Sequence, residues 1–152
     1  MHKYNTITVG TDGSASSLMA VRTAASLARA YDAHLVIVCA YYNTTGSLLN
    51  SPSAEYSTLP VVSDSRAEEY LAQAQAVAEE EKATNVTAAA LSGSPVQMLI
   101  DAVEKYDADL LVVGNRGVNT LSGRVFGNIP TGVARKANVD VMIVDTSSQA
   151  ND

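Results

Sequence analysis

Two glycine-rich segments of this 152-residue chain have the composition of an anion-binding site. The first is GTDGS at residues 10–14, and the second begins as GNRG at residues 114–117 and continues to GNIP at residues 127–130. The three glycines that lead the second segment follow the spacing G-x2-G-x9-G. Glycine lets backbone N–H groups approach a phosphate and turn inward at positive φ, and a following helix adds free N–H groups. The spacing therefore predicts a phosphate site, although the same glycines would also serve simple turns.

The distribution of charge agrees with a small-anion site in the second segment. The chain carries a net charge of −6, yet residues 114–136 contain four basic residues and no acidic one. Arg116 and Arg124 either contact phosphate or remain in solvent, whereas Arg135 and Lys136 suit the C-terminal end of a helix. The overall acidity argues against a general nucleic-acid-binding protein, because such proteins neutralise phosphates with many basic residues.

Asp12 is the one acidic residue in these two segments. Its carboxylate would accept a hydrogen bond from a ligand or bridge a metal ion, with Mg2+ as the candidate, or it simply forms an Asp-Gly turn. The chain has no G-x-S-x-G nucleophile turn, no phosphate-binding Gly-Lys-Ser/Thr and no G-x-G-x-x-G fingerprint. One cysteine and two histidines leave too few ligands for the usual zinc or iron sites. We predict a binding site with no catalytic residue and no resident metal.

Hydrophobic patterning predicts strands that alternate with helices along the chain. Short apolar runs rich in β-branched residues indicate strands, and apolar residues spaced three or four apart indicate helices. Consecutive parallel strands need crossover helices, so the alternation predicts a parallel sheet covered on both faces, a three-layer α/β sandwich. Ligands of such sheets bind beyond the carboxyl ends of the strands, where both glycine-rich segments fall. The expected strands are residues 4–10, 34–40, 86–91, 109–114 and 139–145, and the expected helices are residues 15–30, 65–82, 95–106 and 128–136.

Capping residues predict where these helices begin. Ser14 precedes the first helix, and Ser65 with Glu68 forms a capping box at the start of the second. Ser94 precedes Pro95 at the start of the third helix, a position that proline favours. Asn128 would cap the last helix, with Pro130 in its first turn.

Length and composition predict one domain that spans residues 1–152. Hydrophobic residues make up 47% of the chain and charged residues 17%, which is enough apolar material for a core. Residues 41–63 break the pattern and predict a long variable loop, and residues 146–152 predict a flexible tail. No apolar stretch is long enough for a membrane span, and the N-terminus lacks the features of a secretory signal. We expect a soluble, cytoplasmic protein.

The motifs VGTDGS, VVGNRG and the downstream GN together resemble the universal stress protein family over residues 3–145. The resemblance implies a Rossmann-like α/β fold whose five-stranded parallel sheet has the order 3-2-1-4-5. It also implies a homodimer and, in the nucleotide-binding branch, ATP or another adenine nucleotide as the ligand. Residues 139–144, the final strand, would pair with the same strand of a second subunit. The alternative is that the tail or a helix covers this apolar edge.

The resemblance also implies a role for residues of both segments. Asp12 would lie near the ribose, the backbone around Ala40 would meet the adenine, and Gly114 with Gly117 would hold the ribose and first phosphate. Gly127 with Asn128 would hold the outer phosphates. The residues expected at the nucleotide site are Gly10, Thr11, Asp12, Ala40, Gly114, Asn115, Arg116, Gly117, Gly127, Asn128, Ile129 and Pro130.

Two departures from the family pattern bear on the number of phosphates. ATP-binding members usually have Ser or Thr where Asn128 stands, and Pro130 removes a backbone donor. Both weaken the case for a triphosphate, so AMP and cyclic AMP are equal candidates. The leading function is a regulator that acts through ligand-dependent conformation. The alternatives are a slow ATP hydrolase, with Asp12 positioning a metal-bound water, and an interaction module that binds no nucleotide.

Overall fold

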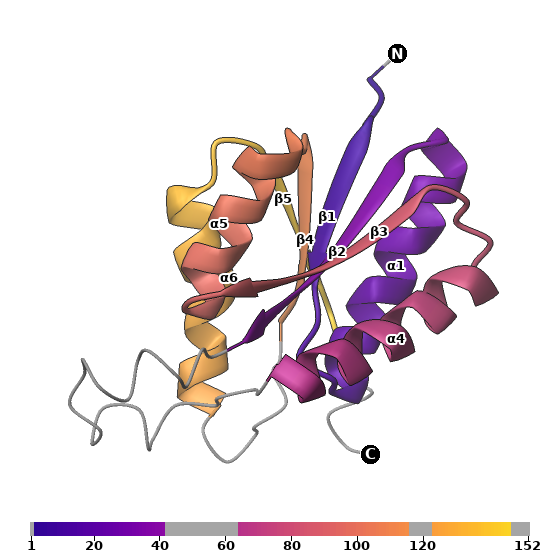
Figure 1. Cartoon of the computed structure of the whole chain (residues 1–152). Coiled ribbons are helices and arrows are strands. Elements are labelled where there is room, and N and C mark those ends of the chain that lie inside the picture. The colour runs from indigo at the N-terminus through magenta and orange to yellow at the C-terminus, as the bar shows by residue number, and fades with distance from the viewer. Residues whose placement is uncertain (1, 42–63, 116–122, 147–152) are drawn as a thin grey trace.

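Five parallel strands form one sheet with the order β3-β2-β1-β4-β5 in the computed structural model, which describes residues 2–41, 64–115 and 123–146 (Figure 1). Helices α1 and α4 cover one face of the sheet, and α5 and α6 cover the other. The predicted three-layer α/β sandwich and the strand order implied by the resemblance are confirmed. The strands are β1 (Thr6–Gly10), β2 (His34–Tyr41), β3 (Val86–Ser92), β4 (Leu110–Gly114) and β5 (Asp140–Val144), and the helices are α1 (Ala15–Tyr31), α4 (Asp64–Glu80), α5 (Pro95–Tyr106) and α6 (Gly123–Lys136).

Side chains of the central strands are buried on both faces, which explains their continuous apolar runs. In β2, Leu35 and Ile37 pack in the core beneath α1 and α4, while Val36 and Val38 pack beneath α5 and α6. The face under α1 and α4 is rich in buried alanines, which let both helices approach the sheet closely. The Thr8 hydroxyl, in the middle of β1, is the one buried side-chain N or O atom among the described residues that has no hydrogen-bond partner.

Two helices begin earlier than the caps predicted. Helix α4 begins at Asp64, so Ser65 lies within the helix and is not its N-cap. Helix α6 begins at Gly123, five residues before the expected start, so the prediction that Asn128 caps it is wrong. Apolar residues at positions 125, 126, 129 and 133 continue the helical spacing across this stretch, and Pro130 lies inside the helix.

The other two predicted N-caps stand at helix starts. The Ser14 hydroxyl accepts a hydrogen bond from the Ser17 backbone N–H, as an N-cap should. Ser94 precedes Pro95 as predicted, but its side chain makes no capping hydrogen bond. The remaining element boundaries agree with the predictions within a few residues.

Two predicted segments extend beyond the part of the chain that the structure describes. Residues 42–63 of the predicted loop and residues 147–152 of the predicted tail lie outside it. Within the described helices, none has the length and apolar character needed to span a membrane.

Candidate functional site

The strand order reverses at β1, which lies between β2 and β4. Beyond the carboxyl ends of such strands, parallel sheets bind their ligands. Gly10 ends β1, Gly114 ends β4, and Ala40 lies next to the last residue of β2. All three are half-buried. β1 and β4 therefore end in glycine, and β2 has an alanine one residue before its final Tyr41, so the side chains at these three positions are small or absent.

Asp12 lies in a short loop that hydrogen bonds brace from within. Its Oδ1 accepts hydrogen bonds from the Ser14 backbone N–H at 3.0 Å and the Ser14 hydroxyl at 2.6 Å. The Asp12 backbone N–H donates to the Ser17 hydroxyl oxygen at 3.3 Å, and the Gly13 N–H donates to Thr11 Oγ1 at 3.2 Å. This network holds the carboxylate in a defined direction at the start of α1.

Thr11 joins this loop to the sheet. Its backbone N–H donates to the Val38 carbonyl oxygen at 2.9 Å, which extends the pairing of β1 with β2 by one bond. The Thr11 hydroxyl also lies 3.1 Å from the Ser17 hydroxyl, and Thr11 itself is buried. Thr11 therefore anchors the loop that carries Asp12 to β2 and to the start of α1.

Gly10 has a packing role that the motif alone did not reveal. A Cβ atom built at Gly10 would lie 3.0 Å from Cδ2 of Leu99, a buried residue of α5. The missing side chain therefore lets α5 approach the end of β1. Any larger residue here would displace Leu99, so the packing of α5 against the end of β1 favours glycine at this position.

Asn115 connects the end of β4 to the residues that follow β5. Its Oδ1 accepts hydrogen bonds from the Thr146 backbone N–H at 2.9 Å and the Thr146 hydroxyl at 3.0 Å. Its Nδ2 donates to Asp145 Oδ1 at 3.2 Å, and its backbone N–H donates to the Val144 carbonyl oxygen at 2.9 Å. Thr146 is fully buried. The side chain of this predicted site residue is thus engaged in holding β5 to β4.

Cys39 lies close to the Asp12 loop and is fully buried, as its apolar strand predicted. Burial, and secondarily the negative charge of Asp12, raises the pKa of the Cys39 thiol to about 12. The thiol therefore stays protonated at neutral pH and is a poor nucleophile. Its apolar packing accounts for its presence here.

The remaining predicted site residues belong to the second glycine-rich segment. Arg116 and Gly117 lie outside the described residues. Gly127, Asn128 and Ile129 lie within α6, and Pro130 is buried in the same helix. The free N–H groups at the start of a helix end with its third residue, which in α6 is residue 125. The N–H groups of residues 127 and 128 fall after these, so they bond within the helix.

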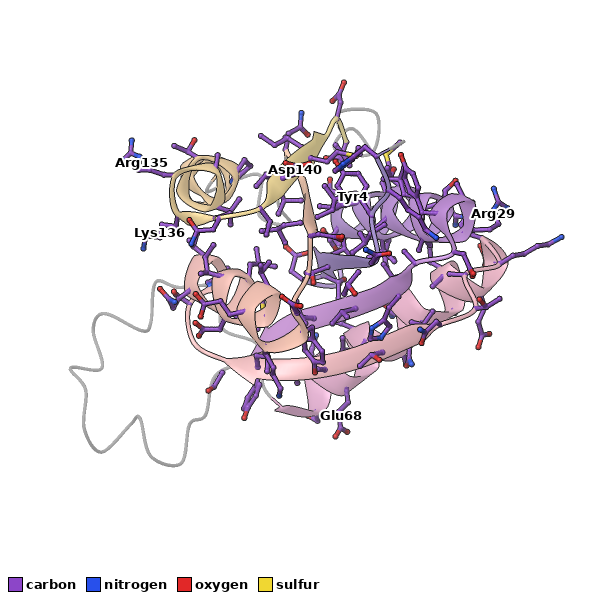
Figure 2. The ribbon with its side chains drawn as sticks, turned by 90° about the horizontal axis from the view of Figure 1, so that it is seen from above. Tyr4, Arg29, Glu68, Arg135, Lys136 and Asp140 are labelled. Atoms are coloured by element: carbon purple, nitrogen blue, oxygen red, sulfur yellow. The ribbon has the colours of Figure 1, made fainter. Side chains whose placement is uncertain are left out.

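Arg135 and Lys136 lie in the last turn of α6, as predicted, and point away from the sheet (Figure 2). Their position suits the negative end of the helix dipole. Nowhere in residues 2–41, 64–115 and 123–146 do three His, Cys, Asp or Glu side chains gather as metal ligands would.

Sequence reasoning missed three residues that organise this end of the sheet. Ser17, three residues after the N-cap, donates its backbone N–H to the Ser14 hydroxyl and its own hydroxyl to the Ser14 carbonyl oxygen, both at 3.0 Å. Tyr70 contacts the loop from α4, and Thr146 binds Asn115 from beyond β5. No local sequence pattern indicates Tyr70 or Thr146, because their partners lie far away in the chain.

Comparison with known proteins identifies relatives along almost the whole chain. The model of the universal stress protein family matches residues 3–145. A universal stress protein of Mycobacterium tuberculosis strain H37Rv is 40% identical over 147 residues, which cover 97% of this chain and 100% of that protein. The crystal structure of a universal stress protein in complex with cAMP is 37% identical, with a TM-score of 0.71, and the match covers 95% of this chain and 99% of that one.

A more distant structure confirms the fold alone. The universal stress protein UspA of Lactobacillus plantarum is 21% identical, with a TM-score of 0.75, over 95% of this chain and 99% of that one. The family match, the relatives above 30% identity and the strand order agree. This chain therefore belongs to the universal stress protein family.

Proposed function

We propose that this protein binds an adenine nucleotide with one phosphate, cyclic AMP first among them, and acts through ligand-dependent conformation. The observation that carries the proposal is a row of small residues beside the Asp12 loop: Gly10 and Gly114 end β1 and β4, and Ala40 lies one residue before the end of β2. The relative that is 37% identical was crystallised with cAMP, which supports the same ligand class here.

The residues of this row fit the parts of such a ligand. The Asp12 carboxylate would accept a hydrogen bond from the ribose 2′-hydroxyl, because ionised carboxylates are strong acceptors. The backbone beside Ala40 would contact the adenine edge. Gly114, with Gly117 beyond it, would let peptide N–H groups approach the phosphate.

The geometry of α6 favours one phosphate over three. A triphosphate needs additional donors for its outer phosphates, and the family resemblance implies that role for Gly127 and Asn128. In α6 their N–H groups follow the first three residues and bond within the helix, and Pro130 has no N–H. A nucleotide with one phosphate needs no hydrogen bond from the N–H groups of residues 127 and 128.

Calorimetric titration of the purified protein with cAMP, AMP, ATP and cGMP, with and without Mg2+, tests the proposal. We expect cAMP or AMP to bind more tightly than ATP, and cGMP to bind weakly. At 100 times its Kd, the bound ligand should stabilise the fold by about 2.7 kcal/mol, which a thermal shift detects readily. Binding of ATP alone, or of no nucleotide, would contradict the proposal.

Replacing Asp12 by Asn tests the site directly. Asp12→Asn should weaken cAMP binding about tenfold, because a charged acceptor becomes a neutral one. Asp101→Asn is the matched control, since Asp101 is exposed on α5 and bonds the Gln97 side chain on the same helix. The control should bind as the unchanged protein does. Steady phosphate release from ATP that Asp12→Asn abolishes would instead support the slow hydrolase.

We also infer that β5 mediates a homodimer. β5 is an edge strand, and Ile143 within it is 50% exposed, the most exposed large hydrophobic residue in the described part of the chain. An apolar edge strand favours pairing with another chain. Sedimentation should show a dimer at micromolar concentration, and Ile143→Lys should shift it toward monomer. A monomeric unchanged protein would contradict this inference.

A further inference from the structure

Gly13, in the loop that carries Asp12, lies directly against the ring of Tyr70 from α4. Its φ angle is +84°, which favours glycine. A Cβ atom built there would lie 2.5 Å from Tyr70 Cδ1, 2.5 Å from Cε1 and 2.7 Å from Cγ. No side chain fits at that distance, so the loop backbone itself is in contact with the aromatic ring.

The contact is made with the face of the ring. A point at nearly equal distances from three consecutive ring atoms lies above the ring plane, since an in-plane point would be much farther from one of them. One α-hydrogen of Gly13 therefore points into the π-electron face of Tyr70. Gly93 offers a contrast, because it also has a positive φ angle, +123°, yet a Cβ atom there would meet nothing within 4 Å.

The ring is held in place from its own helix. Ala67 and Leu71, on either side of Tyr70 in α4, are buried in the core above the sheet. Arg66 donates a hydrogen bond from Nη1 to the Tyr70 hydroxyl at 3.4 Å. Helices α1 and α4 lie side by side on this face (Figure 1), so α4 brings the ring over the loop that leads into α1.

We propose that Tyr70 is a positioning residue for the nucleotide site: its ring supports the backbone at Gly13 and thereby sets the direction of the Asp12 carboxylate. Gly13 lies between Asp12 and Ser14, whose side chains bond one another. A displacement of Gly13 therefore changes the direction in which Asp12 points. The inference rests on the proposed function, because it assigns Asp12 to ligand binding.

The NMR chemical shifts of the Gly13 and Gly93 α-protons test the contact between Gly13 and the Tyr70 ring without any ligand. Protons above an aromatic face are shifted upfield, so one Gly13 α-proton should be shifted upfield and both Gly93 α-protons should not. Tyr70→Phe keeps the ring and should keep the shift. Tyr70→Leu removes the ring and should abolish the shift, while Leu preserves the apolar character of the position. An unshifted Gly13 α-proton in the unchanged protein would overturn the proposal.

Calorimetry with cAMP then tests the positioning role. Tyr70→Leu should weaken binding about tenfold, and Tyr70→Phe should restore it to within about twofold of the unchanged protein. The matched control is Tyr106→Leu, which removes a half-buried tyrosine from α5 on the opposite face. It should lower the melting temperature without changing affinity at a temperature where all variants are folded.

The outcomes separate this inference from the proposed function. If the unchanged protein binds cAMP and Tyr70→Leu binds it equally well, the positioning role is overturned while the nucleotide site stands. If the unchanged protein binds no nucleotide at all, the proposed function fails, and the positioning role fails with it even where the Gly13 shift is present. Loss of affinity in Tyr106→Leu as well would overturn the assignment to Tyr70, because a general loss of rigidity would then explain both.

Discussion

At the amino end of the sheet a side chain bonds across neighbouring strands, whereas the Asp12 network at the carboxyl end bonds within one loop. The Asp109 carboxylate, just before β4, accepts hydrogen bonds from the backbone N–H groups of Asn5 and Thr6 at 2.9 and 3.0 Å. The Tyr4 hydroxyl donates to Asp140 Oδ2 at 2.7 Å, and these two residues lie together in Figure 2. The amino ends of β1, β4 and β5 are thereby joined directly.

At the carboxyl end, the bonds of Asp12 described above join residues of one loop, and Asn115 joins β4 to the chain beyond β5. The Asp12 loop is joined to β2 by the Thr11 backbone N–H, and its contact with α4 is an aromatic ring on a glycine. Because Asn115 ties β4 to the chain beyond β5, the two ends differ only at β1: side-chain hydrogen bonds join its amino end to β4 and β5, whereas packing around glycine shapes the loop at its carboxyl end. A ligand would bind at the second end.

The largest effect is expected for Gly13→Ala, which breaks the packing at the carboxyl end. The added methyl group would both meet the Tyr70 ring and occupy a positive-φ position, and together these should cost about 2 to 4 kcal/mol of stability. Gly93→Ala is the control, because it has the backbone strain without the contact and should cost about 1 to 2 kcal/mol. Urea unfolding measures both, and equal losses would show that Tyr70 does not confine Gly13.

Asn115→Ala should remove the bond between β4 and the residues after β5. The buried Thr146 would lose the acceptor for its N–H and hydroxyl groups, which should cost about 2 kcal/mol. Asn85→Ala, at an exposed position before β3, should change stability by less than about 0.5 kcal/mol. Thermal unfolding compares the two variants. If Asn115→Ala were as stable as the control, water would be satisfying Thr146 equally well.

Asp109→Ala tests the amino end, and it should cost about 1 to 2 kcal/mol because two backbone N–H groups lose a charged acceptor. Its affinity for cAMP should equal that of the unchanged protein, since the residue lies at the opposite end of the sheet. Calorimetry and urea unfolding of the same sample measure both quantities. A fall in affinity comparable to that of Asp12→Asn would show that the two ends are coupled.

Thr8→Val changes the middle of β1, between the two ends. Valine has nearly the same shape as threonine and lacks the hydroxyl that has no partner here, so the variant should gain about 1 kcal/mol. The melting temperature should rise, and cAMP binding should stay the same. A loss of stability would mean that an ordered water satisfies the hydroxyl.

The smallest effect is expected for Tyr4→Phe, because the Tyr4–Asp140 pair is exposed. At pH 7 its melting temperature should differ by less than about 2 °C. The hydrogen bond to Asp140 raises the pKa of Tyr4 above its usual value of 10. The stabilisation that this bond gives the folded protein is therefore present below pH 10 and is lost as pH rises through the raised pKa. Any advantage of the unchanged protein over Tyr4→Phe should therefore disappear above pH 10, and one that grew there would contradict this assignment.

Local patterns in the sequence predicted the elements of the fold well, and the start of α6 less well. Each central strand is buried on both faces, so its apolar run is visible without any knowledge of its partners. Ser14 and Ser94 marked helix starts because caps depend on neighbouring residues. Pro130 misled the prediction of α6, because the helical spacing of the apolar residues around it prevailed over the preference of proline for a first turn.

The candidate site was predicted in part, and the contacts between distant residues were not. The loop motif indicated Asp12 and the glycines, because turn chemistry and strand ends are read locally. The double role of Asn115 stayed hidden, since its partner Thr146 lies 31 residues away. The same holds for Asp109, which bonds a backbone N–H 103 residues before it.

The sequence by itself determined the alternation of strands and helices, the position of the glycine-rich segments at strand ends and the resemblance to a family, because each depends on residues close together in the chain. Only the tertiary structure decided that Tyr70 packs on Gly13 and that Asn115 bonds the chain after β5. It also decided that Asp109 bonds the amino end of β1 at the opposite end of the sheet. These contacts arise when crossover helices bring distant segments together, and no spacing within one segment encodes them.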